Sequence, residues 1–246
     1  MADTSIPELT GVETLKTVNG VALMRGYDQD GWRWSFHPED RDNPASWYAS
    51  TTGILQPIVH HQLKRWMVDT PGEEQKKILE ETGQRGTEIH KQVALDLQEL
   101  ESNPPPEWLE LKEEHNIVAE ATEVTVYSPT LGYAGTMDFV GRYDDTRGIV
   151  DVKSGYYSIK AGWQLAGYQG AHKELTGEAL GMAVATLRPP PKLWKYEHID
   201  WCWLEFLCCL HIWRGLYHSK LKRMGWQWLY TPILKPVDFI PQEEGG

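Results

Sequence analysis

Three charged side chains lie in apolar, strand-like stretches of the sequence, where charged residues are normally scarce. Asp138 belongs to AGTMDFVGRYD at residues 134–144, while Asp151 and Lys153 belong to RGIVDVKSG at residues 147–155. Because residues i and i+2 of a strand point to the same face, we expect Asp151 and Lys153 to project together, with Val152 turned into the core. Asp138 joins that face if its strand is the antiparallel neighbour.

This combination of charges suits metal-dependent hydrolysis. Two carboxylates, together with backbone carbonyls and water, form an oxygen-rich site that suits Mg²⁺ or Mn²⁺. A lysine beside the metal can orient or deprotonate an attacking water, or its ammonium can stabilise charge developing on a phosphate. The alternative is an ordinary ion pair between Asp151 and Lys153 on a half-exposed sheet, because the pattern Asp-x-Lys is common by chance.

Further polar residues flank the two strand-like stretches. Gln164 and Tyr168 are spaced i, i+4 in a helical segment and share one face of it. His90 follows the apolar stripe of an earlier helical segment and is either structural or a ligand. Glu123 lies in EATEVTVYS, where it is either solvated or an auxiliary acid.

The elements that must position these residues follow one another in a simple order. Apolar spacing predicts a helix before three successive strands, then a second helix and a further strand. These segments are residues 72–100, 118–128, 134–144, 147–155, 159–175 and 179–187. The sequence thus predicts an α/β (α+β) fold in which a mixed central sheet is flanked by helices.

The two ends of the chain differ from this core in their predicted secondary structure. Residues 1–47 form a predicted β extension, with an Asn19–Gly20 pair as a strong hairpin signal. Residues 188–246 form a predicted helical region, dominated by a long amphipathic helix over 199–226. Because repeats, low-complexity tracts and a clear linker are absent from the sequence, residues 1–246 are predicted to form a single domain around a core at 48–187.

Four short motifs in this order resemble the PD-(D/E)XK nuclease superfamily, in its RecB-like branch. They are Gly-x-x-x-His at 86–90, Gly-x-x-Asp at 135–138, Asp-x-Lys at 151–153 and Gln-x-x-x-Tyr at 164–168. The start of the core, YASTTGIL at 48–55 followed by LKRW at 63–66, is also similar to the phage-type and mitochondrial genome-maintenance-type exonucleases of this branch. The resemblance implies a restriction-endonuclease-like αβββαβ core. Met137 stands where some members have proline, a departure that the branch tolerates.

The resemblance also assigns roles to individual residues. It implies a Mg²⁺ or Mn²⁺ site with Asp138, Asp151, the Val152 carbonyl and His90 as ligands. Lys153 would be the catalytic lysine, and Gln164 and Tyr168 would position the DNA backbone or the other site residues. Glu123 would be an auxiliary residue. The implied activity is a metal-dependent exonuclease acting from DNA ends, with a structure-specific or nicking endonuclease and an inactive nucleic-acid-binding module as alternatives.

Composition restricts the classes of partner and cofactor. The formal charge of -11 argues against bulk attraction to nucleic acid, although a basic groove can exist on an acidic protein. Three cysteines, all near the C-terminus, are too few for a four-thiolate iron–sulfur cluster, and the chain lacks the phosphate-binding loop of a helicase motor. The free thiols and the absence of a signal peptide or a membrane-spanning stretch predict a cytoplasmic protein. The resemblance implies that its setting is a bacterial or phage-infected cell.

The C-terminal segment HIWRGLYHSKLKRMGWQW interleaves basic and aromatic residues. This composition is typical of a groove that follows a nucleic-acid backbone and stacks its bases. The predicted DNA contacts are Trp213, Arg214, Lys220, Lys222 and Arg223. The alternative is an amphipathic helix with a solvated basic face. A single-strand annealing or recombination protein is a further partner that the resemblance implies.

Overall fold

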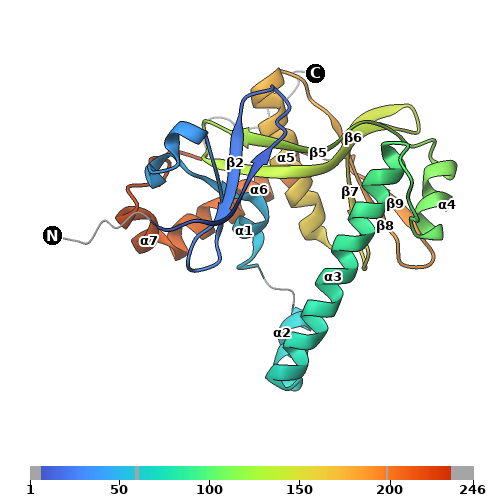
Figure 1. Ribbon diagram of the computed structural model, residues 1–246, viewed down its shortest axis with the longest axis horizontal. Helices are drawn as coiled ribbons and strands as arrows, with labels where there is room; N and C mark the ends of the chain where they lie inside the picture. The colour runs from blue at the N-terminus through green and yellow to red at the C-terminus, as the bar shows by residue number, and fades with distance from the viewer. Residues whose placement is uncertain (1–6, 59–60, 198, 234–246) are drawn as a thin grey trace, which may run out of the picture.

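A mixed β-sheet with helices packed on its two faces forms the body of the protein (Figure 1). The computed structural model describes residues 7–58, 61–197 and 199–233. Within these residues the strands are β1 Thr10–Leu15, β2 Leu23–Tyr27, β3 Arg33–Phe36, β4 Tyr48–Ser50, β5 Val118–Ser128, β6 Tyr133–Tyr143, β7 Thr146–Lys153, β8 Gly181–Thr186 and β9 Lys192–Lys195. The helices are α1 Thr51–Leu55, α2 His61–Asp69, α3 Gly72–Leu97, α4 Pro106–Glu114, α5 Ile159–Thr176, α6 Ile199–Leu216 and α7 His218–Arg223.

Strand β6 is the branching point of the sheet. β5 runs antiparallel along one edge of β6. The other edge is shared, because β4 pairs in parallel with the start of β6 at Tyr133 and Ala134, whereas β7 pairs antiparallel with its end, from Phe139 to Tyr143. Residues 135–138 therefore have no strand partner on that edge among the described residues. The sheet opens at this point.

Two hydrophobic cores lie on opposite faces of the sheet, as the alternation of side chains along β7 and β8 requires. Ile149 and Val184 belong to the larger core, which includes residues of α1, α5, α6 and the N-terminal strands. Val150 and Val152 belong to the smaller core, which is covered by α3 and α4 through Val93 and Trp108 among others. Because neighbouring residues of β7 pack on opposite faces, Asp151 must point away from the core that holds Val152.

The predicted core elements are confirmed, and so is their order. The three predicted strands are β5, β6 and β7, the two helices are α3 and α5, and the following strand is β8. The N-terminal hairpin is formed by β1 and β2, and Gly20 in its loop has a φ of 73°, which favours glycine. Asp144 and Asp145 occupy the turn between β6 and β7, also with positive φ values.

The C-terminal region differs from the prediction of helix alone. Lys192–Lys195 form β9, an edge strand antiparallel to β8, because the chain turns back after the proline-rich residues 189–191. The predicted long helix is two helices, since α6 ends at Leu216 and α7 begins at His218. The break lies at Tyr217, whose ring packs edge-on against Trp32 at a centroid distance of 4.4 Å. Residues 234–246 of the predicted region lie outside the described residues.

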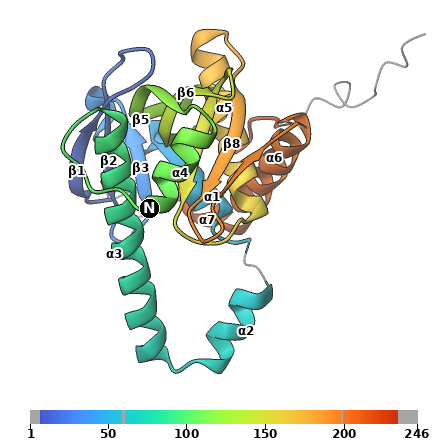
Figure 2. The ribbon, with the colours of Figure 1, turned by 90° about the vertical axis from the view of Figure 1, so that its right-hand side faces the viewer.

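Helix α2 and the first half of α3 extend away from the sheet, and Figure 2 shows this arm from the side. Most residues of α3 before Gly86 are exposed, whereas Val93 is buried against the sheet. One helix therefore continues from solvent to the opening of the sheet, where it carries His90. Among the described residues, none of the helices combines the length and the apolar character that crossing a membrane requires.

Candidate active site

The carboxylate of Asp138 lies at the point where β6 and β7 separate. The last paired residues of the two strands are Phe139 and Val150. One step further, Asp138 Oδ2 accepts a hydrogen bond from the backbone N–H of Val152 at 2.7 Å. A side chain thus satisfies an N–H group that would otherwise lose its partner where the ladder ends. The same bond holds the carboxylate at the opening of the sheet.

Asp151 and Lys153 project from β7 into this opening. Asp151 is 1% exposed, and its Oδ2 atom lies 2.7 Å from Lys153 Nζ. The two groups form an ion pair, and Asp151 Oδ2 has no further hydrogen-bond partner among the described residues. A buried carboxylate oxygen of this kind needs a cation to balance it, and Lys153 supplies that charge in this structure. Val152 is buried in the smaller core, as predicted from the alternation.

His90 reaches the same opening from α3. Its Nδ1 atom lies 3.3 Å from Asp138 Oδ1. Burial opposes protonation of His90, but the hydrogen bond to Asp138 and the negative charge of Asp138 outweigh it and raise the pKa of the imidazole above its ordinary value. Burial likewise disfavours the charged form of Asp138, and here His90 and Lys153 outweigh burial and lower the pKa of that carboxyl.

The pKa values of Asp151 and Lys153 are both raised, which favours the neutral form of the aspartate and the charged form of the lysine. Burial raises the pKa of Asp151 to about 6, because the nearby charge of Asp138 adds to the effect and Lys153 offsets only part of it. Burial opposes the charge of Lys153, but the carboxylates of Asp151 and Asp138 outweigh it and raise the pKa of the ammonium. The site therefore holds a lysine cation against carboxylates with little solvent between them.

Helix α5 supplies an amide and a phenol on one face, as the i, i+4 spacing predicted. Gln164 Nε2 donates to Asp151 Oδ1 at 3.3 Å and to the Tyr168 hydroxyl at 2.6 Å. The Tyr168 ring packs against Gly135, where a Cβ atom would lie 2.2 Å from Tyr168 Cε1. Only glycine at position 135 permits this approach, so the Gly135–Asp138 motif contributes to packing as well as to charge.

Glu123 lies on β5 beside Asp138. Its neighbours Thr122 and Val124 pair with Phe139 and Met137, which places Glu123 opposite Asp138 on the adjoining strand. Its φ of 51° is unusual for a residue other than glycine, and such backbone strain gathers at functional sites. Burial raises the pKa of Glu123, and the charge of Asp138 adds to this shift. Glu123 is nevertheless exposed to solvent and lines the same cavity as Asp138, so its role as an auxiliary residue stays a prediction.

These side chains line one cavity of about 670 Å³, called the site cavity below. It includes His90, Glu123, Asp138, Asp151, Lys153, Gln164 and Tyr168, together with Thr52, Gly86 and Thr136. Two arginines of the N-terminal strands, Arg25 and Arg33, also line it and were not predicted. In the sequence, the only indication of their place in the cavity is that each is a basic residue within the predicted β extension.

The donors in the site cavity fit a hard divalent cation. Apart from its ion pair with Lys153, the buried Asp151 Oδ2 lacks a hydrogen-bond partner among the described residues, and Asp138 presents a second carboxylate beside it. Nowhere in the described part of the chain do three or more His, Cys, Asp or Glu side chains already stand in a metal-ligating arrangement. Lys153 and His90 are instead the groups that balance the two carboxylates in this structure.

The predicted DNA contacts of the C-terminal segment need correction. Trp213 and Arg214 are each 4% exposed, and the Arg214 guanidinium donates to the backbone carbonyls of Leu131 and Thr231. Lys220 is mostly buried in ion pairs with Asp28 and Asp30. Trp213 and Lys220 join α6 and α7 to the N-terminal strands and the loop between them, through Trp32, Trp34 and Asp28. Arg214 joins α6 to the loop before β6 and to the segment after α7.

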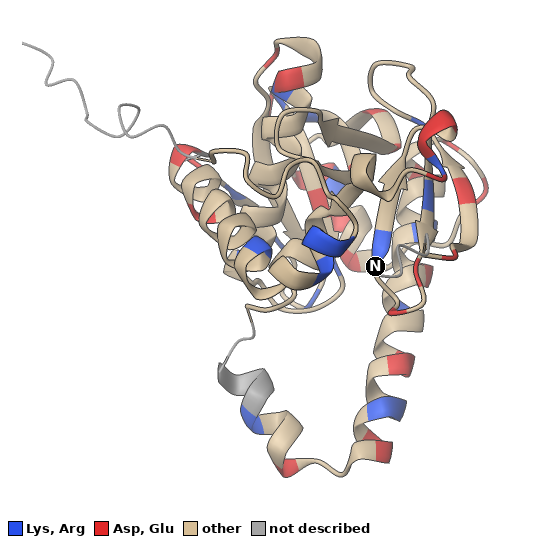
Figure 3. Cartoon of the chain, turned by 90° about the vertical axis from the view of Figure 1, so that its left-hand side faces the viewer, with Lys and Arg blue, Asp and Glu red and all other residues tan. Residues whose placement is uncertain are grey.

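Lys222 and Arg223 are the exposed members of the predicted set. Both lie on α7 and point to solvent. In the cartoon of Figure 3, the positions of basic and acidic residues are interspersed along the chain. A role for Lys222 and Arg223 in DNA binding stays a prediction.

No protein-family model matches the chain, and no curated protein matches it in sequence. The residues that meet in the site cavity are therefore the ground for assigning a function. They combine buried carboxylates, a lysine cation, an imidazole and a fixed amide at the opening of a sheet. Such a set can bind a divalent cation and stabilise an anionic group beside it.

Proposed function

We propose that the chain is a divalent-metal-dependent deoxyribonuclease of the PD-(D/E)XK type that hydrolyses phosphodiester bonds from DNA ends. The observation that carries this proposal is the opening between β6 and β7, where Asp138, Asp151 and Lys153 share one cavity with His90, Gln164 and Tyr168. Residues from four separate motifs are thereby neighbours in space. The element order α3, β5, β6, β7, α5, β8 supports a restriction-endonuclease-like core.

In this proposal Asp138 and Asp151, with the Val152 carbonyl and His90, would hold Mg²⁺ or Mn²⁺. The cation would supply Lewis-acid polarisation of the phosphate. Lys153 Nζ, which lies 2.7 Å from Asp151 Oδ2, would orient the attacking water or stabilise the charge developing on the phosphate. Gln164 would fix Asp151 through its hydrogen bond to Oδ1, and Tyr168 would in turn hold Gln164.

Degradation of linear DNA labelled at its 5′ or 3′ end tests the activity. We expect products with Mg²⁺ or Mn²⁺ and none with EDTA. Lys153→Ala should lower the rate by about 10²–10⁴-fold, the range of a lost acid–base group. Lys173→Ala is the matched control, because Lys173 is an exposed lysine of α5. Undiminished metal-dependent cleavage by Lys153→Ala or by Asp151→Ala would reject the site assignment.

Covalently closed circular DNA separates the two kinds of nuclease. An end-dependent enzyme should leave closed circles intact while it degrades the same DNA after linearisation. Cutting or nicking of the circles would favour an endonuclease instead. Absence of both cleavage and Mn²⁺ binding in a calorimetric titration would favour a non-catalytic module. We place the activity in DNA recombination, replication or repair, with an annealing or recombination protein as a partner.

A further inference from the structure

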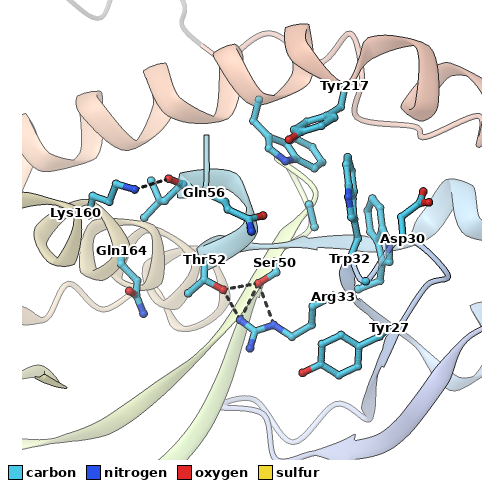
Figure 4. Close-up of a pocket in the computed structure, with 16 residues that line it drawn as sticks. Tyr27, Asp30, Trp32, Arg33, Ser50, Thr52, Gln56, Lys160, Gln164 and Tyr217 are labelled. Carbon is cyan, nitrogen blue, oxygen red and sulfur yellow. Dashed lines mark hydrogen bonds between the residues drawn. The ribbon is translucent and has the colours of Figure 1, made fainter. Parts of the chain in front are cut away.

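A second cavity, of about 620 Å³, adjoins the site cavity and is called the Arg33 cavity below. The two cavities share three lining residues, Arg33, Thr52 and Gln164. Figure 4 shows Arg33 between Tyr27 and the hydroxyls of Ser50 and Thr52, with Gln164 on the far side of Thr52. A molecule bound in the site cavity can therefore continue past Arg33 into the second cavity. The volume is within the range of small-ligand pockets.

Arg33 is a cation whose hydrogen bonds in the structure go to hydroxyl groups. Its Nε and one terminal nitrogen donate to Ser50 Oγ at 3.0 and 2.7 Å, and the same terminal nitrogen donates to Thr52 Oγ1 at 2.6 Å. It forms no ion pair with a carboxylate within the described residues. Because these acceptors are neutral, they do not offset the positive charge of the guanidinium. Its remaining N–H groups can donate to a phosphate.

The other charges of the Arg33 cavity do not cancel this cation. Lys160 Nζ donates to the backbone carbonyl of Leu55 at 3.1 Å, and so it also lacks a carboxylate partner among the described residues. The one acid lining the cavity, Asp30, is paired with Lys220 at 2.7 Å. The Arg33 cavity is therefore positive.

An aromatic ring lies next to the guanidinium. Tyr27 on β2 and Arg33 on β3 are direct cross-strand partners. Tyr27 is 40% exposed and lines the Arg33 cavity. Trp32 and Tyr217 line the same cavity in edge-to-face contact. The exposed Tyr27 ring offers a face on which a base can stack. Arg33, on the neighbouring strand, offers a contact for a phosphate.

The cavity on the other side of the site is close to neutral. It shares Arg25, Glu123 and Thr136 with the site cavity, and Glu13, Glu120 and Lys16 also line it. Glu13 is paired with Arg25 at 2.9 Å, and Glu120 is paired with Arg147 at 2.7 Å. The acids on this side are thus largely balanced by cations, whereas the cations of the Arg33 cavity attract a polyanion.

We propose that the Arg33 cavity binds one unpaired nucleotide of a DNA single strand next to the phosphate in the site cavity. Arg33 binds the phosphate of that nucleotide, and Tyr27 stacks on its base. The inference rests on the proposed nuclease function and adds a substrate class, because a base can stack on Tyr27 only when it has left the duplex. The N-terminal strands are then part of the substrate site.

Binding of a fluorescein-labelled 12-nucleotide single strand and of a blunt hairpin duplex, measured by anisotropy in EDTA, tests the proposal. Tyr27→Ala should weaken single-strand binding at least about 5-fold, the lower end for a lost base–aromatic stack, with a smaller effect on the duplex. Tyr27→Phe should bind as the wild type does. Tyr230→Ala is the control, because Tyr230 is an exposed tyrosine, 73% accessible, outside both cavities. Arg33→Ala should reduce the salt dependence by about one phosphate contact.

A change in the substrate gives a test that needs no unstable variant. A series of oligonucleotides carries one abasic site each, at successive positions. At one of these positions the abasic site should weaken binding to the wild type, and this loss of affinity should be absent in Tyr27→Ala. An equal loss of affinity in both proteins, or wild-type affinity of Tyr27→Ala, would overturn the proposal. If the loss of affinity is present in the wild type and DNA is never cleaved, the subsite stands and the nuclease function fails. If DNA is cleaved but Tyr27→Ala and Arg33→Ala bind single-stranded DNA as the wild type does, the nuclease function stands and the subsite is rejected.

Discussion

Asp138 Oδ2 accepts a hydrogen bond from Val152 N at 2.7 Å, one step beyond the last pair of β6 and β7. The carboxylate thus closes the end of the ladder while its other oxygen faces His90. The Asp138 side chain therefore satisfies the backbone N–H group of Val152 and also supplies negative charge to the site. These two contributions can be separated by substitution.

We expect Asp138→Asn and Asp138→Ala to differ in stability and to agree in activity. Asparagine keeps an acceptor oxygen for Val152 N, whereas alanine leaves that N–H unpaired at a cost of about 1–3 kcal/mol. Both variants lose the carboxylate charge, and both should lose metal-dependent cleavage. Urea unfolding gives the first quantity and the end-labelled DNA assay the second. Full activity of Asp138→Asn would exclude Asp138 as a metal ligand.

Gly135→Ala should destabilise the fold by about 1–3 kcal/mol, because the new Cβ would lie 2.2 Å from Tyr168 Cε1. The displaced ring would also disturb Gln164, so cleavage should fall in the folded variant. Denaturant midpoints measure the stability. Gly215→Ala serves as the control, because nothing lies within 4 Å of its added Cβ on α6. Equal midpoints for Gly135→Ala and the wild type would show that Tyr168 is not held there.

Asp28 should make stability depend on pH in the acid range. Burial disfavours its charge, but hydrogen bonds from Trp34 and Lys220 outweigh burial and lower the pKa of Asp28 below its ordinary value of 3.8. This contribution is complete above the pKa of the unfolded chain and is lost as pH falls through the lower folded value. The free energy of unfolding of the wild type should exceed that of Asp28→Asn by a constant amount above about pH 5 and by less below about pH 4. Urea titrations at pH 7, 5 and 3 measure the difference. A gap that widened toward pH 3 would contradict the assignment.

Arg214→Met should destabilise the protein by about 2–4 kcal/mol, because the guanidinium donates to two carbonyls from a buried position. Its affinity for single-stranded DNA, corrected for the folded fraction, should equal that of the wild type. Anisotropy and urea unfolding on the same preparation measure both. A loss of affinity without a loss of stability would restore the DNA-contact role predicted from the sequence.

The core around the site was predictable because its signals are local. Strand alternation placed Val152 in the core and Asp151 with Lys153 together on the opposite face of the strand, and helical spacing placed Gln164 beside Tyr168. The C-terminal segment was misjudged because composition does not report which surface a helix packs against. Arg214 is buried through a carbonyl 83 residues away in the sequence. Arg33 went unnoticed for the same reason, since its place beside the site depends on the short β3, β4 and β6 pairings.

The packing of the two ends of the chain against each other has a consequence for biosynthesis. Trp226 Nε1 donates to the Trp47 carbonyl at 2.7 Å across 179 residues, and Lys220 meets Asp28 across 192 residues. On a ribosome adding 5–20 residues per second, roughly 10–40 s separate the emergence of these partners. During that interval the tryptophan-rich N-terminal strands have no C-terminal helices to cover them. The nascent chain therefore exposes a large apolar surface first, and the Arg33 cavity is completed only when Trp213 and Tyr217 have been synthesised.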